Sequence, residues 1–153
     1  MMHLSKTLFI GVLILFSACS TSSNKENKDN KSSSSSQDEI RLKQYIVKGG
    51  DIYSLYCANC HQKEGQGLAN LFPPLAGSDY LLSDLERAAC VIKKGLVEEI
   101  EVNGKKYNQM MPPNDHLTPL EVAEVLTYIT NSWGNEKGLI GVKDVESWLS
   151  ACK

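Results

Sequence analysis

The hydrophobic and polar positions divide the chain into three parts. A short apolar run, Thr7 to Phe16, is followed by a polar tract, residues 20–37, that contains no aliphatic or aromatic side chain. From residue 38 onward, apolar positions at helical spacing alternate with long loops, and the length of this part suits one domain. The pattern therefore predicts a single, mainly helical domain behind a polar N-terminal segment.

The clearest helix signal lies at residues 118–134. Thr118 and Glu121 form a capping box, Pro119 takes the first helical position, and Gly134 follows the end. One face is apolar at positions i, i+3, i+4 and i+7, namely Val122, Val125, Leu126 and Ile129. This combination predicts an amphipathic helix packed against the core.

A second helix is predicted at residues 83–95. It opens with a capping box made by Ser83 and Glu86, and Gly95 follows two lysines at its end. The C-terminal signal is typical of a helix that stops at this glycine.

Two further stretches carry weaker helix signals. Residues from about 40 to 56 form one candidate, which we expect to be interrupted at the Gly49-Gly50 pair. Residues 138–153 form a short terminal candidate. No run alternates for long enough to predict a sheet, so the expected fold class is all-α with long loops.

Residues 1–18 have the layout of a secretory signal. Lys6 supplies a basic start, and the apolar run is too short to span a bilayer, which takes about 20 residues. The stretch Phe16-Ser-Ala-Cys19 resembles the bacterial lipobox, although Phe16 stands where that motif usually has Leu. We therefore expect an exported lipoprotein, in the periplasm or at the cell surface, anchored to a membrane by lipid on Cys19. An ordinary secreted protein is the alternative.

Composition adds two expectations. The polar segment 19–38 cannot bury enough apolar surface to offset its ordering entropy, so it predicts a disordered tether. The formal charge of the whole chain is 16 − 18 = −2, and no basic patch of the size that nucleic acid requires is present. Nucleic-acid binding is therefore excluded.

The stretch Cys57-Ala-Asn-Cys60-His61 carries the candidate chemistry. A redox dithiol would follow a strand in a βαβ pattern, which this domain does not show. A structural zinc site needs four ligands, and the other candidates stand isolated, at Cys90, His116 and Cys152. A haem needs only this segment, with two thiols that add to its vinyl groups and an adjacent His that binds iron. We therefore predict one covalent haem c, attached through Cys57 and Cys60, with His61 as an axial ligand.

The second axial ligand must come from a short segment. Once the two N-terminal methionines leave with the signal, the strong candidates are Met110, Met111 and His116. Pro112 holds Met111 extended, which suits a ligand presented on a loop. Adjacent side chains in an extended loop point to opposite sides, so both methionines should not face the iron. These arguments favour Met111, with Met110, His116 or an open site as alternatives.

Residues from about 42 to 134 resemble a class I, single-haem, bacterial-type cytochrome c domain. The matching stretches are GGDIYSLYCANCH (49–61), FPPLAGSDYL (72–81), the helix ending at Gly95, VNGKKYNQMMPP (102–113) and LTPLEVAEVLTYITNSWGN (117–135). The resemblance implies an all-helical fold wrapped around one haem c, with His61 and Met111 as axial ligands. It places the cytochrome c domain at 39–135 and leaves a C-terminal extension at 136–153.

The same resemblance implies roles for other residues. The carbonyl of Pro73 is expected to accept a hydrogen bond from the His61 ring, which orients that ligand. In the first helix, Gly49 and Tyr53 are expected to pack against the last large helix at Tyr128. The pair Tyr107 and Asn108 is expected either to reach a haem edge or propionate or to lie in solvent.

A haem iron held by His and Met has no vacant site, so the expected function is electron transfer and not enzymatic catalysis. The expected partners are a respiratory or dehydrogenase complex as donor and a terminal reductase or oxidase as acceptor. Similar domains serve copper nitrite reductases, terminal oxidases and quinoprotein dehydrogenases. The alternatives are a cytochrome subunit or redox sensor docked on a larger enzyme, and a haem enzyme with an open sixth site.

Two cysteines lie outside the haem motif. Cys90 is expected to act as a small buried hydrophobe on the 83–95 helix. Because an exported protein meets an oxidising environment, a disulfide between Cys90 and Cys152 is the alternative hypothesis.

Overall fold

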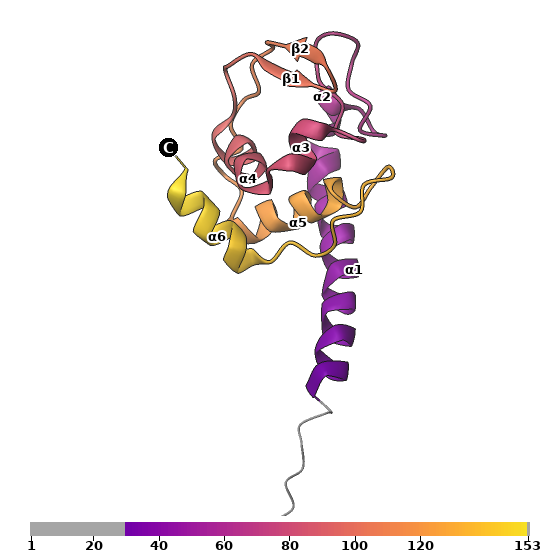
Figure 1. Ribbon diagram of the computed structural model, residues 1–153. Helices are drawn as coiled ribbons and strands as arrows, with labels where there is room; N and C mark the ends of the chain where they lie inside the picture. The colour runs from indigo at the N-terminus through magenta and orange to yellow at the C-terminus, as the bar shows by residue number, and fades with distance from the viewer. Residues whose placement is uncertain (1–29, 153) are drawn as a thin grey trace, which may run out of the picture.

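The computed structural model describes residues 30–152, which form helices and one small sheet (Figure 1). Their elements, in chain order, are α1 (Asn30–Tyr56), α2 (Ala58–His61), α3 (Asp79–Ser83), α4 (Leu85–Lys94), β1 (Ile100–Val102), β2 (Lys105–Tyr107), α5 (Pro119–Ile129) and α6 (Val142–Ala151). The core lies between α1, α4, α5 and α6. The expected all-α class is confirmed, with one hairpin added.

The β1–β2 hairpin is the element that the hydrophobic pattern did not predict. Its strands pair antiparallel over three residues each, with Ile100 opposite Tyr107. Asn103 and Gly104 turn the chain, and both have positive φ, as a two-residue type I′ hairpin turn requires. Three residues per strand are too few to show alternation, so the turn dipeptide was the only available signal.

The crossing of α1 and α5 organises the core, and Figure 1 shows the two helices lying across each other. A Cβ on Gly49 would lie 2.1 Å from the Glu124 carbonyl oxygen, so only glycine permits this approach. The sequence led us to expect that the Gly49-Gly50 pair interrupts this helix. That expectation was wrong, because α1 runs through the pair. The expected packing of Gly49 and Tyr53 near Tyr128 is present, with the two tyrosine rings 5.4 Å apart.

The N-terminal part of α1 corrects the predicted tether. That prediction covered residues 19–38, but α1 begins at Asn30, so residues 30–38 are helical. A helix already fixed by packing in its later turns extends at little further cost, since each added residue gains a hydrogen bond. The exposed ion pair between Asp38 and Arg41, 3.6 Å apart, also favours the extension. The predicted signal and Cys19 lie outside the described residues, as do residues 20–29.

Two helix starts can be compared with their predicted caps. The capping box of Thr118 and Glu121 is present, and Pro119 opens α5. For α4 the prediction of Ser83 as the cap was wrong by one residue. The side chain of Asp84 accepts the cap bond from the Arg87 amide at 2.9 Å, while Ser83 ends α3. Ser83 and Asp84 are both polar and could each cap α4. Because Ser83 is the last residue of α3, Asp84 takes the role.

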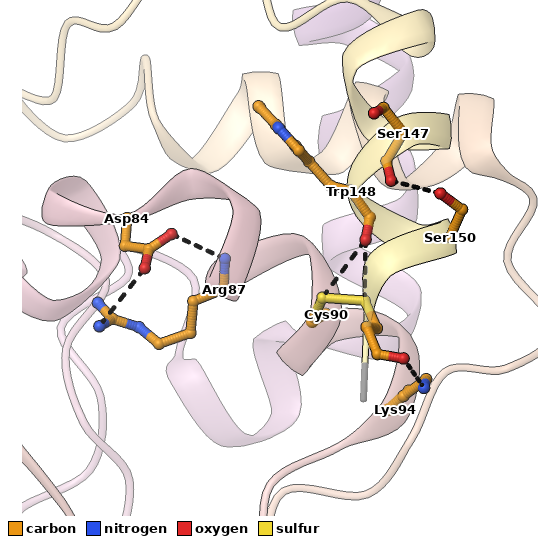
Figure 2. Close-up of a disulfide and its surroundings, with 8 residues drawn as sticks. Asp84, Arg87, Cys90, Lys94, Ser147, Trp148 and Ser150 are labelled. Carbon is orange, nitrogen blue, oxygen red and sulfur yellow. Dashed lines mark hydrogen bonds and ion pairs between the residues drawn. A yellow bond between two sulfur atoms is a disulfide. The ribbon is translucent and has the colours of Figure 1, made fainter.

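The C-terminal extension forms the predicted terminal helix, α6, which packs on α4 and α5. Figure 2 shows the disulfide that joins Cys90 of α4 to Cys152, just beyond the end of α6, with a Cα–Cα distance of 5.7 Å. The expectation that Cys90 is only a small buried hydrophobe was therefore wrong. Sequence could not decide this because 62 positions separate the two cysteines, and only the docking of α6 brings them together.

Among residues 30–152, no helix is both apolar enough and long enough to cross a membrane.

Candidate functional site

A large apolar crevice lies between α2, α3, α4, the hairpin and the loop before α5. It encloses about 1190 Å³ of empty space, a figure that includes space open to solvent. Apolar side chains from four segments line it, among them Phe72, Leu75, Val91, Ile92, Leu96, Ile100, Val102 and Tyr107. A crevice of this size and lining suits a large, flat, hydrophobic group.

The Cys57-to-His61 motif forms one wall of the crevice. Cys57 caps α2, and its carbonyl accepts hydrogen bonds from the amides of Cys60 and His61, at 3.1 and 2.9 Å. This single helical turn brings both thiols and the imidazole to the crevice. Burial, with a smaller contribution from Cys60, raises the pKa of the Cys57 thiol to about 11. A free Cys57 is therefore a neutral thiol at physiological pH.

The imidazole of His61 is oriented by the backbone opposite it. Its Nδ1 lies 3.0 Å from the Pro73 carbonyl oxygen, and the ring N–H donates to that oxygen. The contact that the resemblance implied is thus present, and it leaves Nε2 free. Burial lowers the pKa of His61, although the bond to Pro73 acts in the opposite direction. A neutral ring with one free nitrogen is the form that binds a metal.

Gly67 supports the same wall. Its amide donates to the His61 carbonyl oxygen at 2.9 Å, and its φ of +68° is left-handed. A Cβ here would lie 2.3 Å from the Phe72 carbonyl oxygen and 2.7 Å from the Pro73 carbonyl oxygen. Glycine therefore lets the Pro73 carbonyl approach His61. Sequence reasoning missed this residue, although a glycine six positions after the histidine was visible.

Met111 lies on the loop before α5 and is held by backbone bonds. Leu96 and Met111 form an isolated antiparallel bridge, with reciprocal amide-to-carbonyl distances of 2.9 and 2.8 Å. Gly95, with a φ of +78°, permits this pairing, since a Cβ would lie 2.5 Å from the Met111 carbonyl oxygen. Sequence reasoning assigned Gly95 only to the end of a helix and missed its contact with the loop.

The alternatives to Met111 are placed differently. Met110 also reaches the crevice lining, but 57% of it is exposed, whereas Met111 is partly buried. His116 is exposed and is not among the lining residues; its ring contacts that of Tyr56 in a tilted arrangement, with 4.7 Å between the ring centroids. Of the expected Tyr107–Asn108 pair, Tyr107 is buried and lines the crevice, while Asn108 is exposed.

A cluster of aromatic rings stands behind the motif. Tyr53 contacts both Tyr128 and Trp133, with ring centroids 5.4 and 5.1 Å apart. Its hydroxyl donates to the Gln62 carbonyl oxygen at 2.6 Å, directly after His61. Burial raises the pKa of Tyr53, so the hydroxyl keeps its proton and this bond. Trp133, which packs against Gly65, was not predicted from the sequence.

The residues present fit a covalently attached haem. Two thiols and a neutral imidazole share one helical turn, and a thioether sulfur is available from the loop that lines the crevice with them. The apolar lining suits a porphyrin, and hydrophobic surroundings also influence the potential of a bound iron.

Comparisons with known proteins agree with this fit. The family model described as cytochrome c matches residues 46–133. Cytochrome c-552 of Thermus thermophilus is 41% identical over 99 residues, which cover 62% of this chain and 75% of that protein. The cytochrome c subunit of the quinone alcohol dehydrogenase of Gluconobacter oxydans is 30% identical over 120 residues, or 72% of this chain and 25% of the subunit. The corresponding subunit of Gluconacetobacter polyoxogenes is 33% identical over 101 residues, 65% of this chain and 22% of its own length.

The match to the family model spans more than half of the chain, and the match to the Thermus relative covers 75% of that protein's length. The family-model match includes the Cys57-to-His61 motif and the residues that line the crevice. The chain therefore belongs to the cytochrome c family, as a class I, single-haem member that carries one covalent haem c, with Cys57 and Cys60 in its attachment motif.

Proposed function

We propose that the chain is a single-electron carrier in which His61 and Met111 are the two axial ligands of the haem iron. The observation that carries the proposal is that both side chains line the same apolar crevice, where the Pro73 carbonyl holds the His61 ring and two backbone hydrogen bonds to Leu96 hold Met111. When bound, the haem supplies an iron that changes between ferrous and ferric states. Membership of the family supports electron transfer in general terms.

The chain's own residues have three tasks in this function. His61, oriented by Pro73, presents Nε2 to the iron, and Met111 presents a soft thioether that favours the ferrous state. The apolar lining keeps water away from the iron. It therefore limits how far the surrounding solvent must rearrange when the charge on the iron changes. With both axial positions filled, no site remains for a substrate, which is why we propose a carrier and not an enzyme.

The test uses the optical spectrum of the purified, haem-loaded protein. The oxidised form should show the weak charge-transfer band of a methionine bound to ferric iron, and the reduced form should not bind carbon monoxide. A Met111→Ala variant should lose the band and bind carbon monoxide, whereas Met110→Leu, the matched control, should keep the band. Loss of the band in Met110→Leu alone would transfer the role to Met110. Carbon monoxide binding by the unaltered protein would favour an open-site haem enzyme.

Location forms a second part of the proposal. The signal-like residues 1–18 and the lipobox-like Phe16-to-Cys19 stretch support an exported protein, periplasmic or at the cell surface, anchored by lipid on Cys19. The full-length chain should be found with membranes and should be released from them by detergent. A Cys19→Ser variant should be found in the soluble exported fraction. Equal solubility of both proteins would support an ordinary secreted protein instead.

The proposed partners are a respiratory or dehydrogenase complex as donor and a terminal reductase or oxidase as acceptor. A second candidate is a cytochrome subunit that stays docked on a larger enzyme. The names of the Gluconobacter and Gluconacetobacter relatives, which are subunits of a quinone alcohol dehydrogenase, favour this second candidate. Gentle solubilisation of membranes followed by size separation distinguishes the two. Co-elution of a catalytic subunit in a fixed ratio supports a docked subunit, and a free small cytochrome supports a mobile carrier.

A further inference from the structure

The C-terminal end of α4 is bonded to α6 on one side. The Cys90–Cys152 disulfide joins the two elements, and the Lys94 ammonium, one turn after Cys90, donates to the Cys152 carbonyl oxygen at 2.7 Å. In Figure 2 both contacts lie at the same end of α4, and the disulfide sulfurs lie 3.9 and 3.4 Å from the Trp148 carbonyl oxygen. Behind them, Val145 of α6 is fully buried in the core. The last turns of α4 are thus fixed to the C-terminal extension.

The same end of α4 is bonded, on its other side, to the loop of residues 111–117. The backbone amide and the side-chain amide of Asn114 both donate to the Ile92 carbonyl oxygen, each at 3.2 Å. The Lys93 ammonium donates to the Leu117 carbonyl oxygen at 2.6 Å. The two backbone bonds described above, directly after Gly95, complete the attachment. The proposed ligand loop is therefore held largely by the part of α4 that the disulfide fixes.

We propose that Cys90 and Cys152 are positioning residues for the Met111 ligand: their disulfide restrains the end of α4 and thereby keeps the ligand loop closed on the iron. This inference rests on the proposed ligation by Met111. Helix ends open more readily than helix centres, and local opening breaks the bonds that the end makes with its neighbours. The covalent link at Cys90, one turn before the end of α4, limits that opening, because α6 must move with α4.

Opening the disulfide is a balanced two-electron step. A small dithiol reduces it by thiol–disulfide exchange, so two electrons and two protons pass to Cys90 and Cys152, which become thiols, while the dithiol becomes a disulfide. The α6 helix is then held only by non-covalent contacts, and the end of α4 is free to open more often. The ligand loop opens with it, and the sixth position of the iron becomes accessible for a larger fraction of the time.

The rate at which cyanide binds to the oxidised, haem-loaded protein measures this opening, because cyanide reaches the iron only after the methionine has left. We expect binding to be about tenfold faster, or more, in the Cys90→Ala/Cys152→Ala double variant than in the unaltered protein. The methionine charge-transfer band should also disappear at a lower pH in the variant. A second arm reduces the unaltered protein with a dithiol, caps the two thiols, reoxidises the haem and repeats both measurements. This arm gives a result even if the double variant does not accumulate.

A matched control separates positioning from general loss of stability. Tyr45→Ala truncates a buried side chain on α1, which packs against α5 and α2 and not against α4. It should lower the free energy of unfolding with little effect on cyanide binding. The inference is overturned if this control accelerates binding as much as loss of the disulfide does. It is also overturned if binding is unchanged when a thiol count shows that the disulfide is open. Absence of the methionine band from the unaltered protein would instead overturn the Met111 ligation itself, together with this inference.

Discussion

The Tyr53 hydroxyl donates a hydrogen bond to the Gln62 carbonyl oxygen across a distance of 2.6 Å. This bond joins the last turns of α1 to the residue that follows His61, and Gln62 there adopts a positive φ of 63°. Tyr53 itself is only 2% exposed, so the bond is shielded from water. The haem motif is therefore held from behind by the same helix that packs across α5.

Replacing Tyr53 by Phe should destabilise the protein by about 0.5–1.5 kcal/mol, because the half-buried Gln62 carbonyl oxygen would lose one of its two donors and keep only the Gly65 amide. Denaturant unfolding of the haem-loaded protein measures the change. Tyr45→Phe, which removes a hydroxyl two turns earlier in α1 without touching Gln62, is the matched control and should cost less. Equal losses in the two variants would show that the bond to Gln62 contributes nothing specific.

Gly95→Ala should weaken the attachment of the Met111 loop. An alanine at this position must adopt a φ of 78° and a ψ of −176°, a region that essentially only glycine occupies and that costs about 1–3 kcal/mol, and its Cβ must also displace the Met111 carbonyl oxygen. Gly104→Ala is a close control, since Gly104 has a φ of +75° but nothing within 4 Å of the added Cβ. Both variants should lose stability, but only Gly95→Ala should lose the methionine charge-transfer band at a lower pH. The same pH dependence in both variants would contradict the proposed contact.

The capping box of α5 predicts a dependence of stability on pH. The Glu121 carboxylate accepts hydrogen bonds from the Thr118 amide and hydroxyl, both at 2.7 Å, and these bonds hold the pKa of Glu121 below its ordinary value of 4.5. A carboxyl with a lowered folded-state pKa stabilises the protein above its unfolded-state pKa and loses that contribution as pH falls through the folded-state pKa. Glu121→Gln should therefore be less stable than the unaltered protein near neutral pH, by about 0.5 kcal/mol or less, since the side chain is exposed.

The unfolding free energies of these two proteins should converge as the pH falls below about 4.5, which denaturant titrations at several pH values can measure. In a Thr118→Val background the effect of Glu121→Gln should become smaller, because one of the two hydrogen-bond donors is gone. A difference that grows on acidification would contradict the sign of this prediction.

Reduction of the Cys90–Cys152 disulfide should lower the free energy of unfolding by about 4 kcal/mol, the value that the chain-entropy model gives for a separation of 62 residues. Denaturant unfolding with and without a dithiol measures it. The double variant Cys90→Ala/Cys152→Ala should unfold at the same denaturant concentration in both conditions, which controls for effects of the reductant on the haem. A dithiol effect that persists in this variant would show that the reductant acts elsewhere.

The features that sequence predicted correctly are encoded within a few neighbouring positions. The capping box of Thr118 and Glu121 spans four residues, and the haem motif spans five. Each is complete in itself, so no knowledge of the rest of the fold is needed to recognise it. The terminal helix α6 was predicted for the same reason.

The features that were missed depend on partners far away in the chain. Gly49 was taken as a break in a helix because its partner, the Glu124 carbonyl, lies 75 positions later. Gly95 contacts Met111 across a 15-residue excursion that includes the hairpin, and only the folded chain brings them together. The role of a glycine as a point of close approach cannot be distinguished from a simple break until its neighbour is known.

The unbroken course of α1 has a mechanical consequence. Its 27 residues form a rod about 40 Å long that ends directly before the haem-attachment motif, and its N-terminal end projects away from the other elements (Figure 1). A rod of this kind transmits direction as well as distance. Anything that holds the start of α1 at Asn30 would therefore set both the distance of the haem motif from that point and the direction that the motif faces.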